Sequence, residues 1–125
     1  MEKLNIEQTS RTPLVEFTVG RLRIWGTFVP ENPAEFYLPL HNWIIEYSDN
    51  PAIETIVDVG IVYINGFTMP YLQKLLQELI LLNNEKHKVI INWHFCMNSI
   101  SVKAGEYLSR KLSFPFNFVE VEEIW

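Results

Sequence analysis

Residues 53–64 read IETIVDVGIVYI, a nearly continuous run of β-branched and other apolar residues that decides the fold. Such a run predicts a central β-strand, and an uninterrupted apolar pattern is typical of a strand covered on both faces. The following residues, NGFTMPY at 65–71, form a turn-rich junction before a leucine-rich segment. We therefore expect a strand that leads directly into a helix, as in an α/β unit.

Helical periodicity flanks this strand on both sides. Upstream, Asn32 is a candidate cap, Pro33 suits the first helical position and Glu35 completes a capping box. Pro39 lies inside this helix, and SDNP at 48–51 ends it. A third, weaker helix is expected over 100–112. The apolar positions that share a face in the first two helices are Phe36, Leu40, Trp43, Ile44 and Tyr47, then Leu72, Leu75, Leu76, Leu79 and Ile80.

The remaining strands are expected at 14–18, 22–28, 88–95 and 116–121. The first two form a hairpin, and strand–helix–strand crossovers place the later strands parallel. The order ββαβαβαβ predicts a single α/β domain with a five-stranded mixed sheet, a leading β-hairpin, three βαβ crossovers and three helices. Residues 1–12 are polar, so we expect a flexible N-terminus followed by one domain over 13–125.

Composition and charge exclude several classes of protein. The chain of 125 residues has 10 Lys and Arg against 15 Asp and Glu, a net charge of −5. An acidic domain without a basic run is a poor ligand for nucleic acid. Its apolar stretches are too short to span a membrane, and the N-terminus lacks the apolar core of a signal peptide. The lone Cys96 fits a reducing compartment, so we expect a cytoplasmic protein.

Catalytic and cofactor motifs are not evident in the sequence. The glycines are scattered and do not form a phosphate-binding loop. His94 and Cys96 share one face of a predicted strand, which makes a metal or Cys–His site conceivable, but two ligands are weak evidence for it. The last acidic residues, Glu120, Glu122 and Glu123, suggest a solvated tail. We therefore expect a protein that is not an enzyme and has no metal or cofactor.

The junction after Tyr63 is the strongest candidate for a functional site. Partners and anions dock where parallel strands end and helices begin. Thr68 is either a helix cap or a phosphoacceptor in this junction. Pro70 favours Met69 as the cap position, which places Thr68 outside the helix, where an enzyme can reach it.

The apolar residues of the junction either fold back on the core or form a contact surface for another protein. The sequence alone leaves both alternatives open. The candidate partner-binding residues are Asn65, Gly66, Phe67, Thr68, Met69 and Tyr71.

Several short motifs, in order along nearly the whole chain, resemble SiaC-like bacterial regulatory phosphoproteins. The N-terminal half contains TPLVEF at 12–17, PENPAEFY at 30–37, Pro39-Leu40 and Trp43-Ile44. The match resumes with YIN at 63–65, NWH at 92–94, AGE at 104–106 and FPF at 114–116.

This resemblance implies a STAS-like α/β fold and a role in a partner-switching pathway. In such pathways a Ser/Thr kinase phosphorylates the regulator and a PP2C-type phosphatase removes the phosphate. The unphosphorylated form binds and activates a diguanylate cyclase, which makes c-di-GMP. The resemblance therefore implies a signalling protein that binds other proteins and catalyses no reaction.

The chain departs from the family pattern at the phosphoacceptor. Relatives end the strand in Asn-Thr-Ser-Ser and phosphorylate the threonine after the asparagine, whereas here Gly66 follows Asn65. Either Thr68 has taken over as acceptor, or the chain is a constitutive protein-binding adaptor that has lost the switch. A second departure is CMNS at 96–99, where relatives carry an acidic loop.

Overall fold

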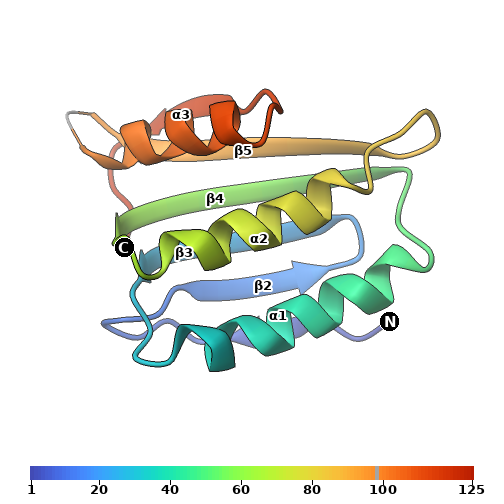
Figure 1. Ribbon diagram of the computed structural model, residues 1–125, viewed down its shortest axis with the longest axis horizontal. Coiled ribbons are helices and arrows are strands. Elements are labelled where there is room, and N and C mark those ends of the chain that lie inside the picture. The colour runs from blue at the N-terminus through green and yellow to red at the C-terminus, as the bar shows by residue number, and fades with distance from the viewer. Residues whose placement is uncertain (98) are drawn as a thin grey trace.

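The computed structural model describes residues 1–97 and 99–125 and consists of one mixed sheet and three helices (Figure 1). The elements in chain order are β1 (Leu4–Ile6), β2 (Leu14–Thr18), β3 (Arg21–Phe28), α1 (Pro33–Ser48), β4 (Glu54–Ile64), α2 (Met69–Ile80), β5 (Lys88–Cys96), α3 (Ser101–Lys111) and β6 (Asn117–Val121). The α/β class and the leading hairpin are confirmed. The expected strand count is wrong, because the sheet has six strands.

The strands lie side by side in chain order, from β1 to β6. β1, β2 and β3 pair antiparallel, whereas β3, β4, β5 and β6 pair parallel. Each helix therefore connects two neighbouring parallel strands. This arrangement puts the carboxyl ends of the four parallel strands at one edge of the molecule.

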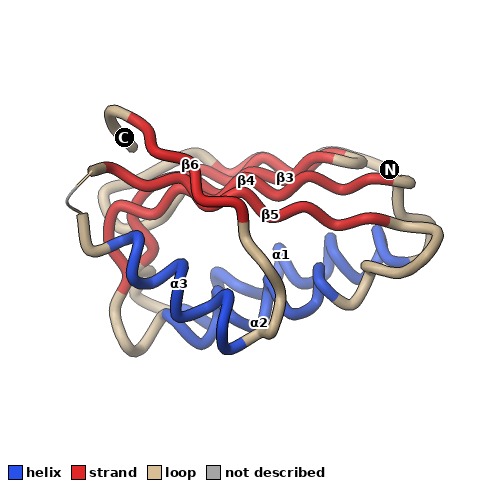
Figure 2. The backbone as a smooth tube through the Cα atoms, turned by 90° about the horizontal axis from the view of Figure 1, so that it is seen from above, coloured by secondary structure: helices blue, strands red, loops and turns tan. Residues whose placement is uncertain are grey.

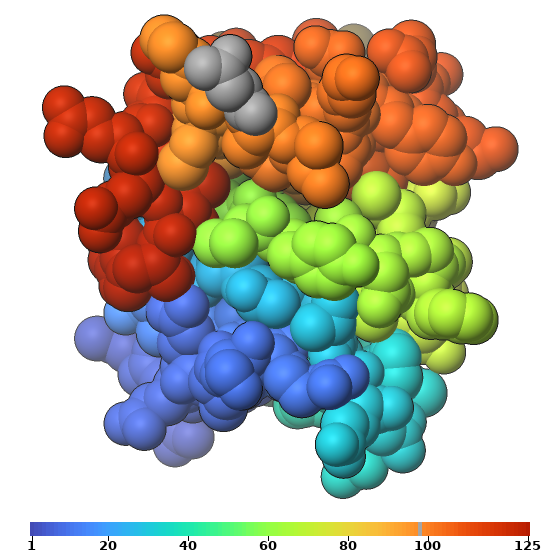
Figure 3. Space-filling view, turned by 90° about the vertical axis from the view of Figure 1, so that its left-hand side faces the viewer, coloured from blue at the N-terminus to red at the C-terminus, as the bar shows by residue number. Residues whose placement is uncertain are grey.

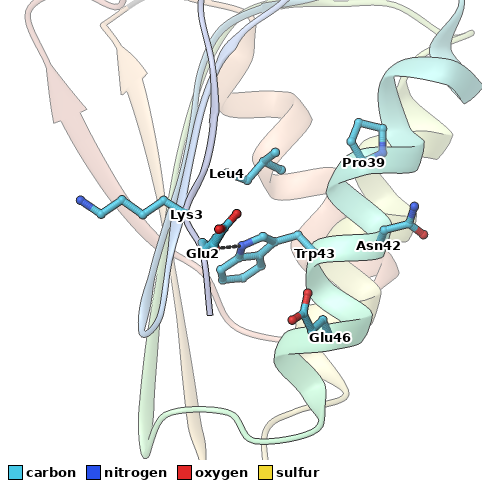
Figure 4. Close-up of a pocket in the computed structure, with 7 residues that line it drawn as sticks. All are labelled: Glu2, Lys3, Leu4, Pro39, Asn42, Trp43 and Glu46. Atoms are coloured by element: carbon cyan, nitrogen blue, oxygen red, sulfur yellow. Dashed lines mark hydrogen bonds between the residues drawn. The ribbon is translucent and has the colours of Figure 1, made fainter.

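The strand that the sequence analysis missed is β1, inside the segment expected to be flexible. Leu4 pairs with Phe17 and Ile6 pairs with Val15. The indole Nε1 of Trp43 donates a 2.9 Å hydrogen bond to the carbonyl of Glu2. Figure 4 shows Trp43 pointing from α1 toward this strand beside a hollow of about 450 Å³, with Lys3 directed away from α1. Three residues are too few for a readable alternating pattern, so tertiary contacts define this strand.

All three helices cover the same face of the sheet, as Figure 2 shows from above. The core forms between them and includes Val57, Val59 and Ile61 of β4 and the leucines of α2. The periodicities of α1 and α2 are confirmed, because Leu40, Trp43, Ile44 and Tyr47 of α1 and Leu72, Leu75, Leu76 and Leu79 of α2 are buried. The helices cover this one face of β4, whereas the expected cover of its second face has another source.

Long side chains from neighbouring strands bury the second face of β4. Trp25 packs against Gly60 so closely that a Cβ atom on residue 60 would lie 2.6 Å from the Trp25 ring. Arg23 in turn lies 4.6 Å from the centroid of the Trp25 ring, a cation–π distance. Trp25 is only 6% exposed, although no helix covers it. The apolar run of β4 is therefore compatible with a sheet that has helices on one face and large side chains of the sheet on the other.

Asp58, also on this second face, is the centre of a polar cluster. Arg21 donates to Asp58 Oδ2 at 3.1 Å, Asn92 donates to Oδ1 at 3.1 Å, and His94 Nε2 lies 3.2 Å from Oδ1. Burial raises the pKa of the carboxyl group. The hydrogen bonds from Asn92 and His94 and the charge of Arg21 outweigh that effect and hold the Asp58 pKa below its usual value.

The contact between α1 and α2 contains a second polar cluster. Tyr37 donates to Glu78 Oε1 at 3.0 Å, and His41 Nδ1 contacts the same oxygen. Burial, together with the hydrogen bond to Glu78 and its charge, raises the pKa of Tyr37 to about 12. The Tyr37 ring also lies 5.8 Å from that of Tyr71, so this cluster adjoins the first turn of α2.

The start of α1 agrees with the sequence. Asn32 caps α1 by accepting a 3.1 Å hydrogen bond from the Glu35 N–H, which confirms the predicted cap.

Across residues 1–97 and 99–125, the helices are too short or too polar to cross a membrane.

We predict that Gly105→Ala destabilises the protein. A Cβ atom at position 105 of α3 would lie 2.6 Å from the ring of Trp93, which is fully buried and anchored by a 2.9 Å bond from Nε1 to the Ser101 carbonyl. Overpacking of this kind costs about 1–3 kcal/mol. Helix propensity alone predicts the opposite sign, because alanine is the better helix former.

The matched control is Gly66→Ala, since a Cβ atom there meets no neighbour within 4 Å. Denaturant unfolding should show a change of less than about 0.5 kcal/mol for this control. Equal effects of the two substitutions would contradict the packing of α3 on Trp93.

Candidate functional site

The junction between β4 and α2 lies at the edge where the parallel strands end. Figure 3 views this edge, with the green junction between cyan residues near position 30 and orange residues near position 100. These segments are far apart in the sequence, but the parallel pairing of β3, β4 and β5 brings them together. The predicted junction therefore lies on a surface to which several connecting segments contribute.

Asn65 holds the junction in one conformation. Its Oδ1 accepts hydrogen bonds from the N–H groups of Phe67 and Thr68, each at 3.0 Å. Its carbonyl accepts a 2.9 Å bond from the Met69 N–H, which starts the helical turn. An asparagine that bonds backbone groups two and three residues on stabilises a tight turn. The connection is therefore short and closed by its own hydrogen bonds.

Thr68 is buried in this turn, with 1% of its surface exposed. Its hydroxyl accepts a 3.2 Å bond from the Asn65 N–H and donates toward Asn65 Oδ1 at 3.1 Å. The prediction that Thr68 is easily reached by an enzyme is therefore wrong. Thr68 takes the cap position and Met69 is the first helical residue. The steric rule for the residue before a proline does not include the Asn65 hydrogen bonds, which favour this geometry.

The other candidate residues divide by exposure. Phe67 is 84% exposed, and Gly66 beside it is exposed with open space at its Cβ position. Asn65, Met69 and Tyr71 are partly buried. The structure therefore brings all six candidates together, but Phe67 and Gly66 face solvent most directly.

Two hollows adjoin the junction. A notch of about 90 Å³ is lined by residues of β4, α2 and α3, namely Ile61, Val62, Tyr63, Ile64, Met69, Ile100, Ser101 and Ala104. A wider hollow of about 440 Å³ is lined by Arg11, Val29, Pro30, Glu31, Pro33, Asn65, Phe67, Thr68 and Tyr71. The junction residues therefore contribute to both an apolar notch and a more polar depression.

Further apolar side chains extend this surface. Val62 is 45% exposed, Tyr63 is 49% exposed and Ile100 is 68% exposed. We name Val62, Tyr63, Gly66, Phe67 and Ile100 the junction surface. Val62, Tyr63 and Ile100 are not among the candidates from the sequence, because the first two end a predicted strand and the last starts a predicted helix. The departure at 96–99 includes Asn98, which lies outside the described residues.

His94 and Cys96 do not gain a third metal ligand. His94 Nε2 lies beside Asp58 on the second face of the sheet. Within residues 1–97 and 99–125, no three metal-binding side chains cluster together. These contacts give His94 a place in the polar cluster of Asp58.

Comparisons with known proteins agree with this fold. The chain is 24% identical to an uncharacterized protein of Pseudomonas aeruginosa (strain UCBPP-PA14) over 93% of the chain and 94% of the relative. Apo-SiaC from Pseudomonas aeruginosa has a similar structure, with a TM-score of 0.85 and 23% identity over 95% of this chain and 99% of that one. A chain in the structure of the diguanylate cyclase SiaD with its activator SiaC, from the same organism, gives a TM-score of 0.84, 23% identity and coverage of 94% and 99%.

The family comparison is decisive, because it extends over most of the domain. The sequence pattern of the SiaC family regulatory phosphoproteins matches residues 6–121, from the last residue of β1 to the end of β6. The chain therefore belongs to the SiaC family of regulatory phosphoproteins.

Proposed function

We propose that the protein is a regulator that binds a diguanylate cyclase through the junction surface. The observation that carries the proposal is Phe67, which is 84% exposed on a turn closed by the Asn65 hydrogen bonds. The partner class comes from the similar SiaC chain, which activates the diguanylate cyclase SiaD. This function requires binding and no chemical reaction at the surface.

The geometry suits a protein contact. An exposed aromatic side chain can contribute about 1.5–3 kcal/mol when a partner buries it. Because the turn is already closed, little backbone entropy is lost when the partner binds. The apolar notch beside Met69 has about 90 Å³ of space, which suits a protruding apolar side chain of the partner.

We further propose that binding through this surface does not depend on a phosphate at Thr68. The hydroxyl of Thr68 is buried and bonded to Asn65 on both its donor and acceptor sides. A phosphate would break these bonds and place about −1.5 to −2 charges on a side chain that is 1% exposed. This favours the constitutive adaptor over a switch at Thr68.

A second candidate function is a partner switch in which a Ser/Thr kinase phosphorylates Thr68 and a PP2C-type phosphatase reverses the modification. The observation that favours it is the family itself, whose members are described as regulatory phosphoproteins. In this chain the switch would require the Asn65 turn to open before the kinase reaches the hydroxyl.

We predict that Phe67→Glu weakens binding to the diguanylate cyclase of the source organism at least tenfold, because the charge loses hydration without a partner group. The matched control is Leu81→Glu, since Leu81 is 72% exposed at the opposite end of α2. Isothermal titration with the purified cyclase measures both affinities, and c-di-GMP formation from GTP measures activation. Unchanged affinity of Phe67→Glu, or a larger loss in Leu81→Glu, would contradict the assigned surface.

We also predict that a Ser/Thr kinase encoded beside this gene does not phosphorylate Thr68 of the folded protein. The Gly66→Thr variant places a hydroxyl at an exposed position with no neighbour within 4 Å, so it should accept phosphate there. Mass spectrometry of both proteins identifies the modified position. The variant is the positive control for the kinase.

Phosphate on Thr68 of the wild-type protein, with loss of cyclase binding, would favour the switch over the adaptor. Thr68→Val provides a check on folding, because it removes the hydroxyl while keeping a similar shape. Its free energy of unfolding should fall by about 1–3 kcal/mol, since polar groups of Asn65 lose their buried partner.

A further inference from the structure

We propose that the outer edge of β6 binds an extended, basic segment of a partner protein, which adds to the sheet as a further strand. This site is separate from the junction surface and uses backbone hydrogen bonds as its main recognition. Strand addition of this kind is a common mode of peptide binding.

The backbone of β6 is hydrogen-bonded to a neighbouring strand along one of its two edges. β6 lies at the end of the sheet and pairs with β5, from Asn117 opposite Asn92 to Val121 opposite Cys96. Within the described parts of the chain, the backbone groups of 117–121 have no further backbone partner. The strand contains no proline, no lysine and no irregularity in its register. Proline, lysine and register irregularities are among the features with which proteins protect an exposed edge, and Glu120 is the charged residue that this strand does contain.

The opposite edge of the sheet is protected, which makes β6 distinctive. β1 has three residues and follows directly after Lys3. The bond from Trp43 to the Glu2 carbonyl ties its start to α1. A short edge flanked by lysine and held by a helix is a poor template for another strand. The two edges of the same sheet therefore differ in their capacity to pair.

The side chains of β6 define what an added strand must contain. The register places Phe118 beside Trp93 on the helix side of the sheet, with Glu120 on the same side. Val119 and Val121 lie on the other side. Phe118 is 40% exposed and Val119 is 36% exposed, so both faces of β6 offer apolar contacts. The added strand would cover them with apolar side chains at alternate positions.

The charge of the edge selects a basic partner. Glu120, Glu122 and Glu123 are exposed, and none forms an ion pair within residues 1–97 and 99–125. A lysine or arginine opposite Glu120 would gain a cross-strand pair. A second copy of this chain is disfavoured as the occupant, because it would bring three more carboxylates to the same edge.

The probe is a capped peptide, Thr-Val-Lys-Val-Phe-Thr, whose lysine faces Glu120 when the peptide pairs antiparallel with Val121–Phe118. Titration into isotope-labelled protein should shift the amide NMR signals of 117–121, and hydrogen exchange of the outward amides should slow at least threefold at saturation. Glu120→Lys should weaken the affinity at least fivefold, and a peptide with glutamate in place of lysine should restore binding to that variant.

Two controls separate strand addition from simple charge attraction. Glu106→Lys makes the same change in net charge at an exposed position of α3 and should leave the affinity unchanged. Phe67→Glu should also bind the peptide normally, which keeps this test independent of the proposed function. Alternate N–H groups of an added strand point toward β6. N-methylation of those residues should abolish binding, whereas N-methylation of the residues whose N–H groups point away should preserve it.

Three results would overturn the proposal. The first is no shift in β6 at saturating peptide, and the second is equal loss of affinity in Glu120→Lys and Glu106→Lys. The third is self-association of the protein alone that Glu120→Lys changes, because it would assign the edge to a second copy of the chain.

Discussion

The parallel pairing of β4 with β3 and β5 is the constraint on which the rest of the structure depends. In this pairing Gly60 lies opposite Trp25 of β3 and opposite His94 of β5. Because Gly60 has no side chain, the large ring of Trp25 can cover β4 without a second layer of helices. The pairing also brings the ends of the parallel strands to one edge. Because β4 continues directly into Asn65, the position of the proposed binding surface follows from the pairing of the sheet.

The junction combines rigidity with exposure. Asn65 bonds the backbone of the turn, and buried Thr68 bonds Asn65 in return. This closed arrangement leaves Phe67 exposed without leaving the backbone free to move away from the partner. Ordering a loop adds to the free-energy cost of binding, so a closed turn suits a surface that binds a partner. The membership of the chain in a regulatory family agrees with this role.

Much of the fold followed from residue patterns, and the failures have specific physical causes. The cap at Asn32 and the leucine face of α2 depend on local chemistry, so the sequence predicted them. β1 depends on pairing with β2 and on a contact with Trp43, which a three-residue pattern does not reveal. The proline rule places Thr68 outside the helix, whereas the hydrogen bonds that Thr68 donates to the Asn65 side chain hold it in its buried position. Ile100 comes from a distant segment, so its place beside the end of β4 is visible only in three dimensions.

The central claim is that the partner contacts the edge where the parallel strands end. The most direct measurement is amide chemical-shift mapping of the labelled protein with the proposed partner, an unlabelled diguanylate cyclase of the source organism. The account predicts that the largest changes fall on Tyr63, Gly66, Phe67 and Ile100. The opposite edge, represented by the exposed Ile53 and Leu81, should change little. Changes confined to that opposite edge, with none at the junction, would contradict the account.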